Sequence, residues 1–92
     1  MIYFDWSSDK NVTLKAERGV GFEDVVITIQ QGHILNILPH PNRSKYPNQK
    51  IFILEIYSYI YYVPFIESEE TIFLKTIIPS RKMTKKYLKN NK

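Results

Sequence analysis

No cysteine occurs among the 92 residues, which excludes disulfides, zinc knuckles, iron–sulfur clusters and thiol nucleophiles. Long apolar runs are missing as well. The longest, residues 56–66, is interrupted by a serine and a proline and falls short of the ~20 residues that a membrane-spanning helix needs. No signal peptide is expected, because Asp5, Asp9 and Lys10 precede any apolar segment. These absences indicate a soluble, cytoplasmic protein.

Acidic residues are missing from the C-terminal part, where the last one is Glu70. The chain has a formal net charge of +4 and a pI near 9.3. Beyond Glu70 every charged side chain is basic: Lys75, Arg81, Lys82, Lys85, Lys86, Lys89 and Lys92. A basic end of this kind favours an anionic partner, either a nucleic acid or an acidic protein. The alternative is a solvated helix that only maintains solubility.

Alanine and arginine are scarce, with one and three residues, whereas isoleucine and lysine are abundant with thirteen and ten. This bias is typical of AT-rich coding sequences, so the number of lysines carries little information. The arginines Arg18, Arg43 and Arg81 carry more, because a guanidinium binds phosphate with a planar fork. His33 and His40 lie seven residues apart with no paired carboxylates, so neither a metal nor a cofactor is expected.

A chain of 11.0 kDa has room for one domain, residues 1–92. Residue patterns predict a strand at 2–6, helices at 10–18 and 22–31, strands at 34–38, 51–57, 59–66 and 71–78, and a last helix at 81–89. Consecutive strands with short turns and segregated helices predict an α+β fold with an antiparallel sheet of about four strands.

Capping residues define the expected helix ends. Residues 7–9 offer N-cap side chains, Gly19 ends the first helix, and Ser80 can cap the last one. Within the first helix, Val12 and Ala16 are expected to make the i, i+4 apolar contact.

The segment 22–31 can be read in two ways. Its run of β-branched residues is compatible with a strand, but Phe22, Val25 and Ile29 share one helical face. Glu23 and Asp24 stand where the first turn of a helix favours acidic side chains. A helix is therefore predicted.

Two features of the predicted strands concern their turns and faces. Tyr57 and Ser58 make a poor hairpin turn. In strand 71–78, alternation places Ile72 and Leu74 on one face and Ile77 on the other.

Residues 39–49 contain three prolines and are expected to form a long surface loop. His40 in this loop has the chemistry of a general acid or base, because histidine titrates near neutral pH. Arg43, Lys45 and Tyr46 combine two cations with an aromatic plane, which suits RNA bases and phosphates. The alternative for His40 is an ordinary polar surface residue. The other tyrosines are expected mainly in the core and on the sheet.

Both ends of the chain resemble BrnT-type toxins. The opening Phe4-Asp5-Trp6, then Lys10, then residues 19–24 (GVGFED) is similar to the first strand, helix and interhelical joint of that family. Residues 77–87 (IIPSRKMTKKY) are similar to the segment that enters the family's last helix. The chain departs from the family pattern at Leu14, Arg18 and Gly21, where the family has asparagine, histidine and serine.

The resemblance implies a RelE-like toxin of a type II toxin–antitoxin pair. Such toxins are metal-independent endoribonucleases that cleave mRNA, many of them on the ribosome, and thereby inhibit translation. The cleavage uses the substrate's own 2′-OH as nucleophile. A cognate antitoxin covers the basic site in a toxin–antitoxin hetero-oligomer.

The expected catalytic residues are Arg81, Lys10 and His40. Arg81 opens the last helix, where a guanidinium and backbone N–H groups can hold the scissile phosphate. Lys10 can contact phosphate or transfer a proton. The expected RNA-binding residues are Lys82, Arg43, Lys45, Tyr46, Arg18 and Lys85. For Arg81 and Lys10, ordinary exposed side chains are the alternative, and the departures from the family pattern leave open a non-catalytic module that binds RNA or a partner protein.

Overall fold

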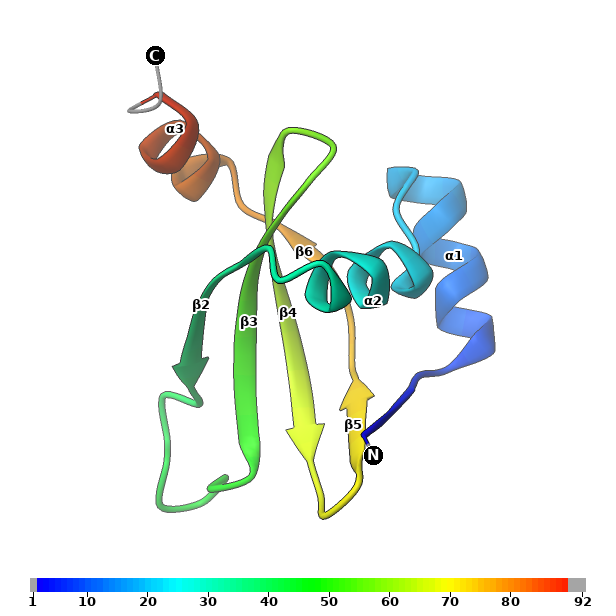
Figure 1. The fold of residues 1–92 in the computed structure, drawn as a ribbon, viewed down its shortest axis with the longest axis vertical. Helices are drawn as coiled ribbons and strands as arrows, with labels where there is room; N and C mark the ends of the chain where they lie inside the picture. The colour runs from blue at the N-terminus through cyan, green and yellow to red at the C-terminus, as the bar shows by residue number, and fades with distance from the viewer. Residues whose placement is uncertain (1, 90–92) are drawn as a thin grey trace.

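The protein is described by a computed structural model that covers residues 2–89. Three helices and six strands follow one another as β1 (Tyr3–Asp5), α1 (Ser8–Arg18), α2 (Phe22–Gln30), β2 (Ile34–Pro39), β3 (Gln49–Ile56), β4 (Tyr59–Glu67), β5 (Thr71–Leu74), β6 (Ile78–Pro79) and α3 (Arg81–Lys89) (Figure 1). The α+β class, the three helices and the helical state of α2 are confirmed. Lys92 of the basic C-terminal run lies outside the described residues.

The sheet is mixed and has six strands in the described residues, so the prediction of an antiparallel sheet of about four strands is wrong in strand number and for one pair. The strand order is β1-β5-β4-β3-β2, with β6 paired to β4. The strands from β2 to β5 pair antiparallel, whereas β1 runs parallel to β5. Short turns impose antiparallel pairing on consecutive strands. No such turn joins β1 to β5, since most of the chain lies between them.

The predicted strand at 71–78 is divided into β5 and β6. Phe65 of β4 faces Leu74, and Tyr61 faces Pro79. Between these pairs, the chain that follows Leu74 has four residues where β4 has three. One of the three is Pro64, which has no N–H. The extra residue is a bulge that reverses the alternation of side chains. Ile77, predicted on the face opposite Leu74, is therefore completely buried.

Helix ends follow the capping residues. The Ser7 hydroxyl accepts from the Lys10 N–H at 3.3 Å, Gly19 ends α1 with a left-handed φ of 70°, and the Ser80 hydroxyl accepts from the Met83 N–H at 3.2 Å. Val12 and Ala16, the predicted apolar pair of α1, do not face the core: Val12 is 68% exposed and Ala16 is exposed.

The buried side of α1 consists of Asn11 and Leu14, which are three residues apart on another stripe of the helix. Asn11 thereby becomes one of the two buried polar residues among those described.

The main core lies between the sheet and helices α1 and α2. Phe22 and Val25 of α2 are completely buried, and the Trp6 ring stacks on the Phe22 ring with centroids 5.7 Å apart. On the opposite face of the sheet, Ile53 and Ile60 are also buried. Helix α3 packs against β4. No helix within residues 2–89 has the length and apolar character to cross a membrane.

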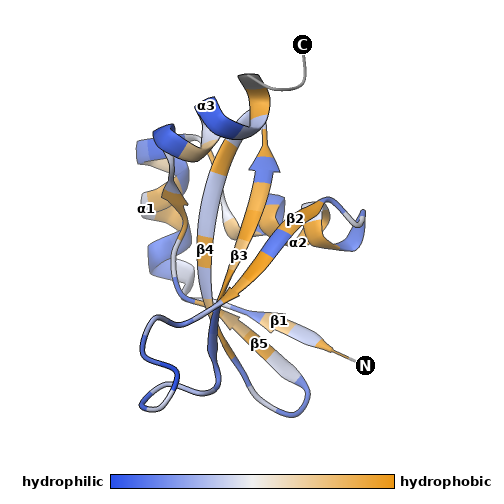
Figure 2. Ribbon diagram, turned by 90° about the vertical axis from the view of Figure 1, so that its left-hand side faces the viewer, coloured by the Kyte–Doolittle hydropathy of each residue, from blue (hydrophilic) through white to orange (hydrophobic). Residues whose placement is uncertain are grey.

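The free edge of β2 carries apolar side chains, with Leu35, Ile37 and Leu38 all exposed. The Ile37 N–H points away from β3 and donates to the Asn36 side chain at 2.8 Å. The His40 N–H donates to Gln49 on β3, so the nitrogen of Pro39 before it faces outward, and as a proline nitrogen it carries no hydrogen. Figure 2 shows the apolar character of β2 and β3 and the hydrophilic loop between them.

Tyr57 and Ser58 form the two-residue turn between β3 and β4, with φ angles of 53° and 61°. Hairpin turns of this kind require positive φ at both positions and favour asparagine and glycine. For other residues the left-handed region costs roughly 1–2 kcal/mol. For this reason the sequence predicted a poor hairpin turn, yet Tyr57 and Ser58 join β3 directly to β4.

We expect Ser58→Gly to raise the free energy of unfolding by about 0.5–1 kcal/mol, because glycine adopts this φ without steric cost. Urea denaturation measures the change. Ser44→Gly, at an exposed loop position without positive φ, is the control and should give no gain. An equal gain in both variants would show that the turn is not strained.

Candidate nucleic-acid interface

The three residues predicted to be catalytic lie in three separate places. Lys10 is in the first turn of α1, His40 is in the β2–β3 loop, and Arg81 is the first residue of α3. Figure 1 shows α1 and α3 on different sides of the sheet, and both views place the β2–β3 loop at the far end of the molecule from α3. The structure therefore does not bring Lys10, His40 and Arg81 together in one site.

Helix α3 is fixed to β4 through both backbone groups of one residue. The Ile60 carbonyl accepts from the Ser80 N–H at 2.9 Å, and the Ile60 N–H donates to the Thr84 hydroxyl at 2.9 Å. Met83, Thr84, Tyr87 and Leu88 are half-buried, whereas the basic residues Arg81, Lys82, Lys85 and Lys86 are exposed. The start of α3 is thus held beside β4 with its cations facing solvent.

Two tyrosines occupy the adjoining end of β4. The Tyr59 and Tyr61 rings are tilted, with centroids 5.6 Å apart; Tyr59 is half-buried and Tyr61 is 7% exposed. Burial raises the pKa of the Tyr61 hydroxyl, and Tyr59 and Asp24 raise it further, whereas the positive charge of Arg18 lowers it. Tyr61 therefore remains a protonated donor at neutral pH, within the field of the Arg18 guanidinium.

We call Arg18, Tyr59 and Tyr61 the tyrosine–arginine cluster, because Arg18 acts on Tyr61 and the two tyrosine rings lie together. Arg18 ends α1, and the β6 register with the Ser80–Ile60 bond places the start of α3 at the level of Tyr59 and Ile60. Lys10 is eight residues before Arg18 on the same helix, about 12 Å along its axis. Arg18 thus acts on the tyrosine end of β4, Arg81 starts the helix that is bonded to Ile60 of the same strand, and Lys10 lies at the other end of α1.

The remaining predicted residues meet in the β2–β3 loop. His40, Arg43, Lys45 and Tyr46, here called the loop cluster, surround one cavity or contact its lining. The structure therefore brings together the four loop residues that the sequence singled out, although at the end of the molecule opposite α3.

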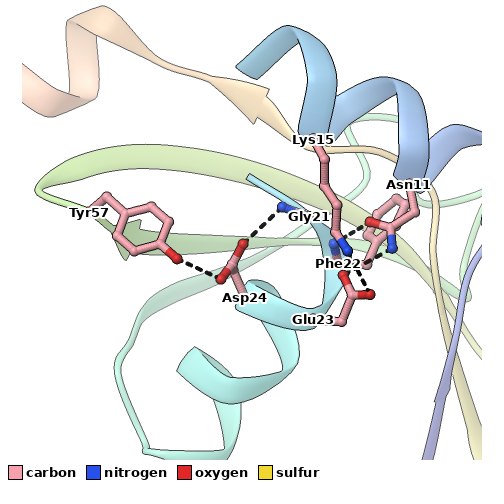
Figure 3. A network of polar contacts seen from close by, with 7 residues as sticks. All are labelled: Asn11, Lys15, Gly21, Phe22, Glu23, Asp24 and Tyr57. Carbon is pink, nitrogen blue, oxygen red and sulfur yellow. Dashed lines mark hydrogen bonds and ion pairs between the residues drawn. The ribbon is translucent and has the colours of Figure 1, made fainter. Parts of the chain in front are cut away.

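A polar network at the α1–α2 joint was missed by the sequence analysis (Figure 3). The Asn11 side chain accepts from the buried Phe22 N–H at 2.7 Å and donates to Glu23 at 2.9 Å, and Lys15 contacts the second Glu23 oxygen at 3.0 Å. The signal available in the sequence was that Asn11, a polar residue, lies on the same helix face as the apolar Leu14. The network ties α1 to the start of α2.

Gly21, which stands where the resembling family has serine, lies inside this network. A Cβ atom here would come within 2.5 Å of the Lys15 side chain, 2.8 Å of Glu23 and 2.9 Å of Asn11. Because residue 21 has no Cβ atom, these three side chains have room to lie close to its backbone.

Asp24 connects the joint to the β3–β4 turn. Its carboxylate accepts from the Gly21 N–H at 2.9 Å and from the Tyr57 hydroxyl at 2.8 Å. This hydrogen bond raises the pKa of Tyr57. The Tyr57–Ser58 turn is thereby bonded to the first turn of α2. The Asp24 charge also raises the pKa of Tyr61 on β4.

The pKa of Glu23 is lowered from its ordinary 4.5 to about 2, first by the Asn11 hydrogen bond and also by Lys15. A carboxyl group with a lower pKa in the folded state stabilises the protein above its ordinary pKa, and this contribution is lost as the pH falls towards 2. We expect Glu23→Gln to flatten the fall in stability between pH 4.5 and about 2. Because half of the side chain is exposed, the effect is modest.

Urea denaturation at several pH values measures this slope. Glu17→Gln, on the exposed surface of α1, should keep the slope of the wild type. If both variants titrate alike, the acid sensitivity arises elsewhere.

The residues that the structure describes contain no group of three potential metal-ligating side chains. Comparison of the chain with protein-family models, with curated proteins and with solved structures finds no match.

Proposed function

We propose that the protein is the toxin of a type II toxin–antitoxin pair, with a RelE-like architecture, and that it cleaves RNA without a metal. The observation that carries the proposal is the position of α3: Arg81 begins a helix whose start is hydrogen-bonded to Ile60, the residue between Tyr59 and Tyr61 on β4, and the charge of Arg18 acts on Tyr61. The resemblance of both chain ends to BrnT-type toxins supports the same function.

Cleavage of this kind needs few protein groups. The ribose 2′-oxygen loses its proton and attacks phosphorus, and the bond to the 5′-oxygen breaks as that oxygen gains a proton. The products are a 2′,3′-cyclic phosphate and a 5′-hydroxyl. The enzyme orients the two oxygens and stabilises negative charge on the phosphate.

The start of α3 and the tyrosine–arginine cluster offer these groups. The Arg81 guanidinium can bind two phosphate oxygens, and the N–H groups of Arg81 and Lys82 start a helix without partners inside it. Arg18 adds a second cation, and the tyrosine hydroxyls are donors. Lys82 and Lys85 extend the positive surface along α3.

A second candidate function is a non-catalytic RNA-binding module. The separation of Lys10, His40 and Arg81 favours it, because no general base from that set accompanies Arg81. In this case the cationic surfaces bind RNA, and binding weakens steeply with salt because counterions are released.

One cleavage assay separates the two functions. Purified protein is incubated in EDTA with a defined, end-labelled single-stranded RNA, and the products are resolved on a denaturing gel. The proposal expects cyclic-phosphate products and growth arrest when the protein is expressed alone. Salt-sensitive binding without products would establish the second function, and normal growth with folded protein present would contradict the toxin.

The proposed partner is an acidic antitoxin segment over Arg81, Lys82 and the exposed side of α3. Opposite charges on exposed surfaces attract over about 10 Å at 0.1 M salt and much less at 1 M. The complex should therefore weaken as salt rises, and affinity that does not change with salt would place the partner elsewhere.

A further inference from the structure

The β2–β3 loop borders an open surface cavity of about 380 Å³. The half-buried rings of His40 and Tyr46 line this cavity, and their centroids are 4.5 Å apart. The Lys45 ammonium lies 5.4 Å from the Tyr46 ring centroid. Arg43, an exposed residue, also lines the cavity. An aromatic wall and two cations therefore meet at one concave surface.

Hydrogen bonds within the loop hold this surface in shape. The Asn42 carbonyl accepts from the Tyr46 N–H at 3.0 Å, and the Asn42 side chain accepts from the Lys45 N–H at 3.2 Å. The His40 Nδ1 accepts from the Asn42 N–H at 2.9 Å. This bond places the proton of the neutral imidazole on Nε2, which can donate to a ligand. A site that is organised before binding loses less entropy when a ligand enters.

We propose that this cavity binds a single nucleotide, with its base against the Tyr46 ring and its phosphate at Arg43 and Lys45. The volume suits a small ligand. A base stacks on an aromatic ring, whereas the neighbouring cations attract phosphate. Lys50 also lines the cavity, but its ammonium pairs with Glu67 at 3.0 Å, so Arg43 and Lys45 supply the charge.

The inference deepens the proposed function and rests on it for the source of the nucleotide, which is an RNA strand that also reaches α3. The loop and α3 lie at opposite ends of the longest dimension of the protein, which measures 39 Å. The nucleotide in the loop is therefore distant from the phosphate that Arg81 would hold. In this arrangement His40 acts in binding and positioning rather than at the cleaved bond.

Adenosine 5′-monophosphate is the probe, and the ring protons of the two histidines are the NMR reporters. His40 is in the cavity lining, whereas His33 lies outside it, next to the end of α2. We expect the His40 signals to shift on titration while the His33 signals stay in place. Adenosine without phosphate should bind more weakly.

Variants test the two halves of the site. Tyr46→Leu should weaken binding of the monophosphate by about five- to hundredfold, because one stacking contact is lost. Tyr46→Phe keeps the aromatic ring and should bind like the wild type. This control shows whether a substitution at position 46 by itself disrupts the loop. Arg43→Ala should also weaken binding, whereas Tyr3→Leu, at an exposed aromatic residue on β1, is the control and should not.

The inference is overturned if the His40 signals do not move or if Tyr46→Leu binds as tightly as the wild type. Its failure is distinguishable from failure of the proposed function. RNA cleavage without monophosphate binding would contradict the loop site alone. Binding at His40 by a protein that cleaves no RNA would support the site and contradict the cleavage activity.

Discussion

Arg81→Ala should lower the rate of RNA cleavage by about 10²- to 10³-fold, the usual loss when one group that stabilises transition-state charge is removed. The guanidinium is exposed at the start of α3, so its removal should leave the fold intact. Single-turnover cleavage of a defined RNA measures the rate, and circular dichroism checks the fold. Arg81→Lys should recover part of the activity, since it restores the charge but not the planar fork.

Matched variants on the same helices locate the site. Lys86→Ala removes an exposed cation farther along α3, and it should reduce cleavage only slightly. On α1, Arg18→Ala should reduce cleavage more than Lys10→Ala, because the charge of Arg18 acts on Tyr61 and Lys10 stands at the other end of the helix. Unchanged cleavage by Arg81→Ala would contradict the proposed role of α3. A larger loss in Lys10→Ala than in Arg18→Ala would place the reaction at the N-terminal end of α1.

Asn11→Ala should lower the free energy of unfolding by about 2–3 kcal/mol. The substitution removes the acceptor of the Phe22 N–H, a donor in a completely buried residue, and an unsatisfied buried donor costs about 1–3 kcal/mol. It also removes the strongest support of the Glu23 carboxylate. Urea denaturation with a constant m-value measures the change, which is a large part of the stability of a small domain.

Val12→Ala is the control on the same helix. Its side chain is 68% exposed, so the change should stay within about 0.5 kcal/mol. Alanine has the higher helix propensity at both positions, so a loss confined to Asn11→Ala reports the interhelical network, and equal stability of both variants would contradict it.

Local chemistry made most of the fold predictable. Helix ends follow from Ser7, Gly19 and Ser80, because capping depends on residues within a few positions of one another. The mixed sheet and the β5–β6 bulge were not predictable in this way. Both depend on which strands become neighbours, and nothing near Tyr3 or Thr71 in the sequence encodes their parallel pairing.

The candidate site was predictable only in part. The loop cluster could be predicted because its four residues are close in sequence. The pairing of Arg81 with Lys10 was expected from resemblance at the chain ends, but tertiary packing sets the distance between α1 and α3. The approach of Arg18 to Tyr61 joins residues 43 positions apart in the sequence. No periodicity or motif reports such a long-range electrostatic effect.

The edge of β2 has a consequence for behaviour at high concentration. With the Ile37 donor occupied by Asn36 and no donor at Pro39, an incoming strand finds few hydrogen bonds with which to extend the sheet. The exposed leucine and isoleucine side chains there would otherwise invite the growth of fibrils. A chain this rich in isoleucine can thus accumulate without polymerising through that side.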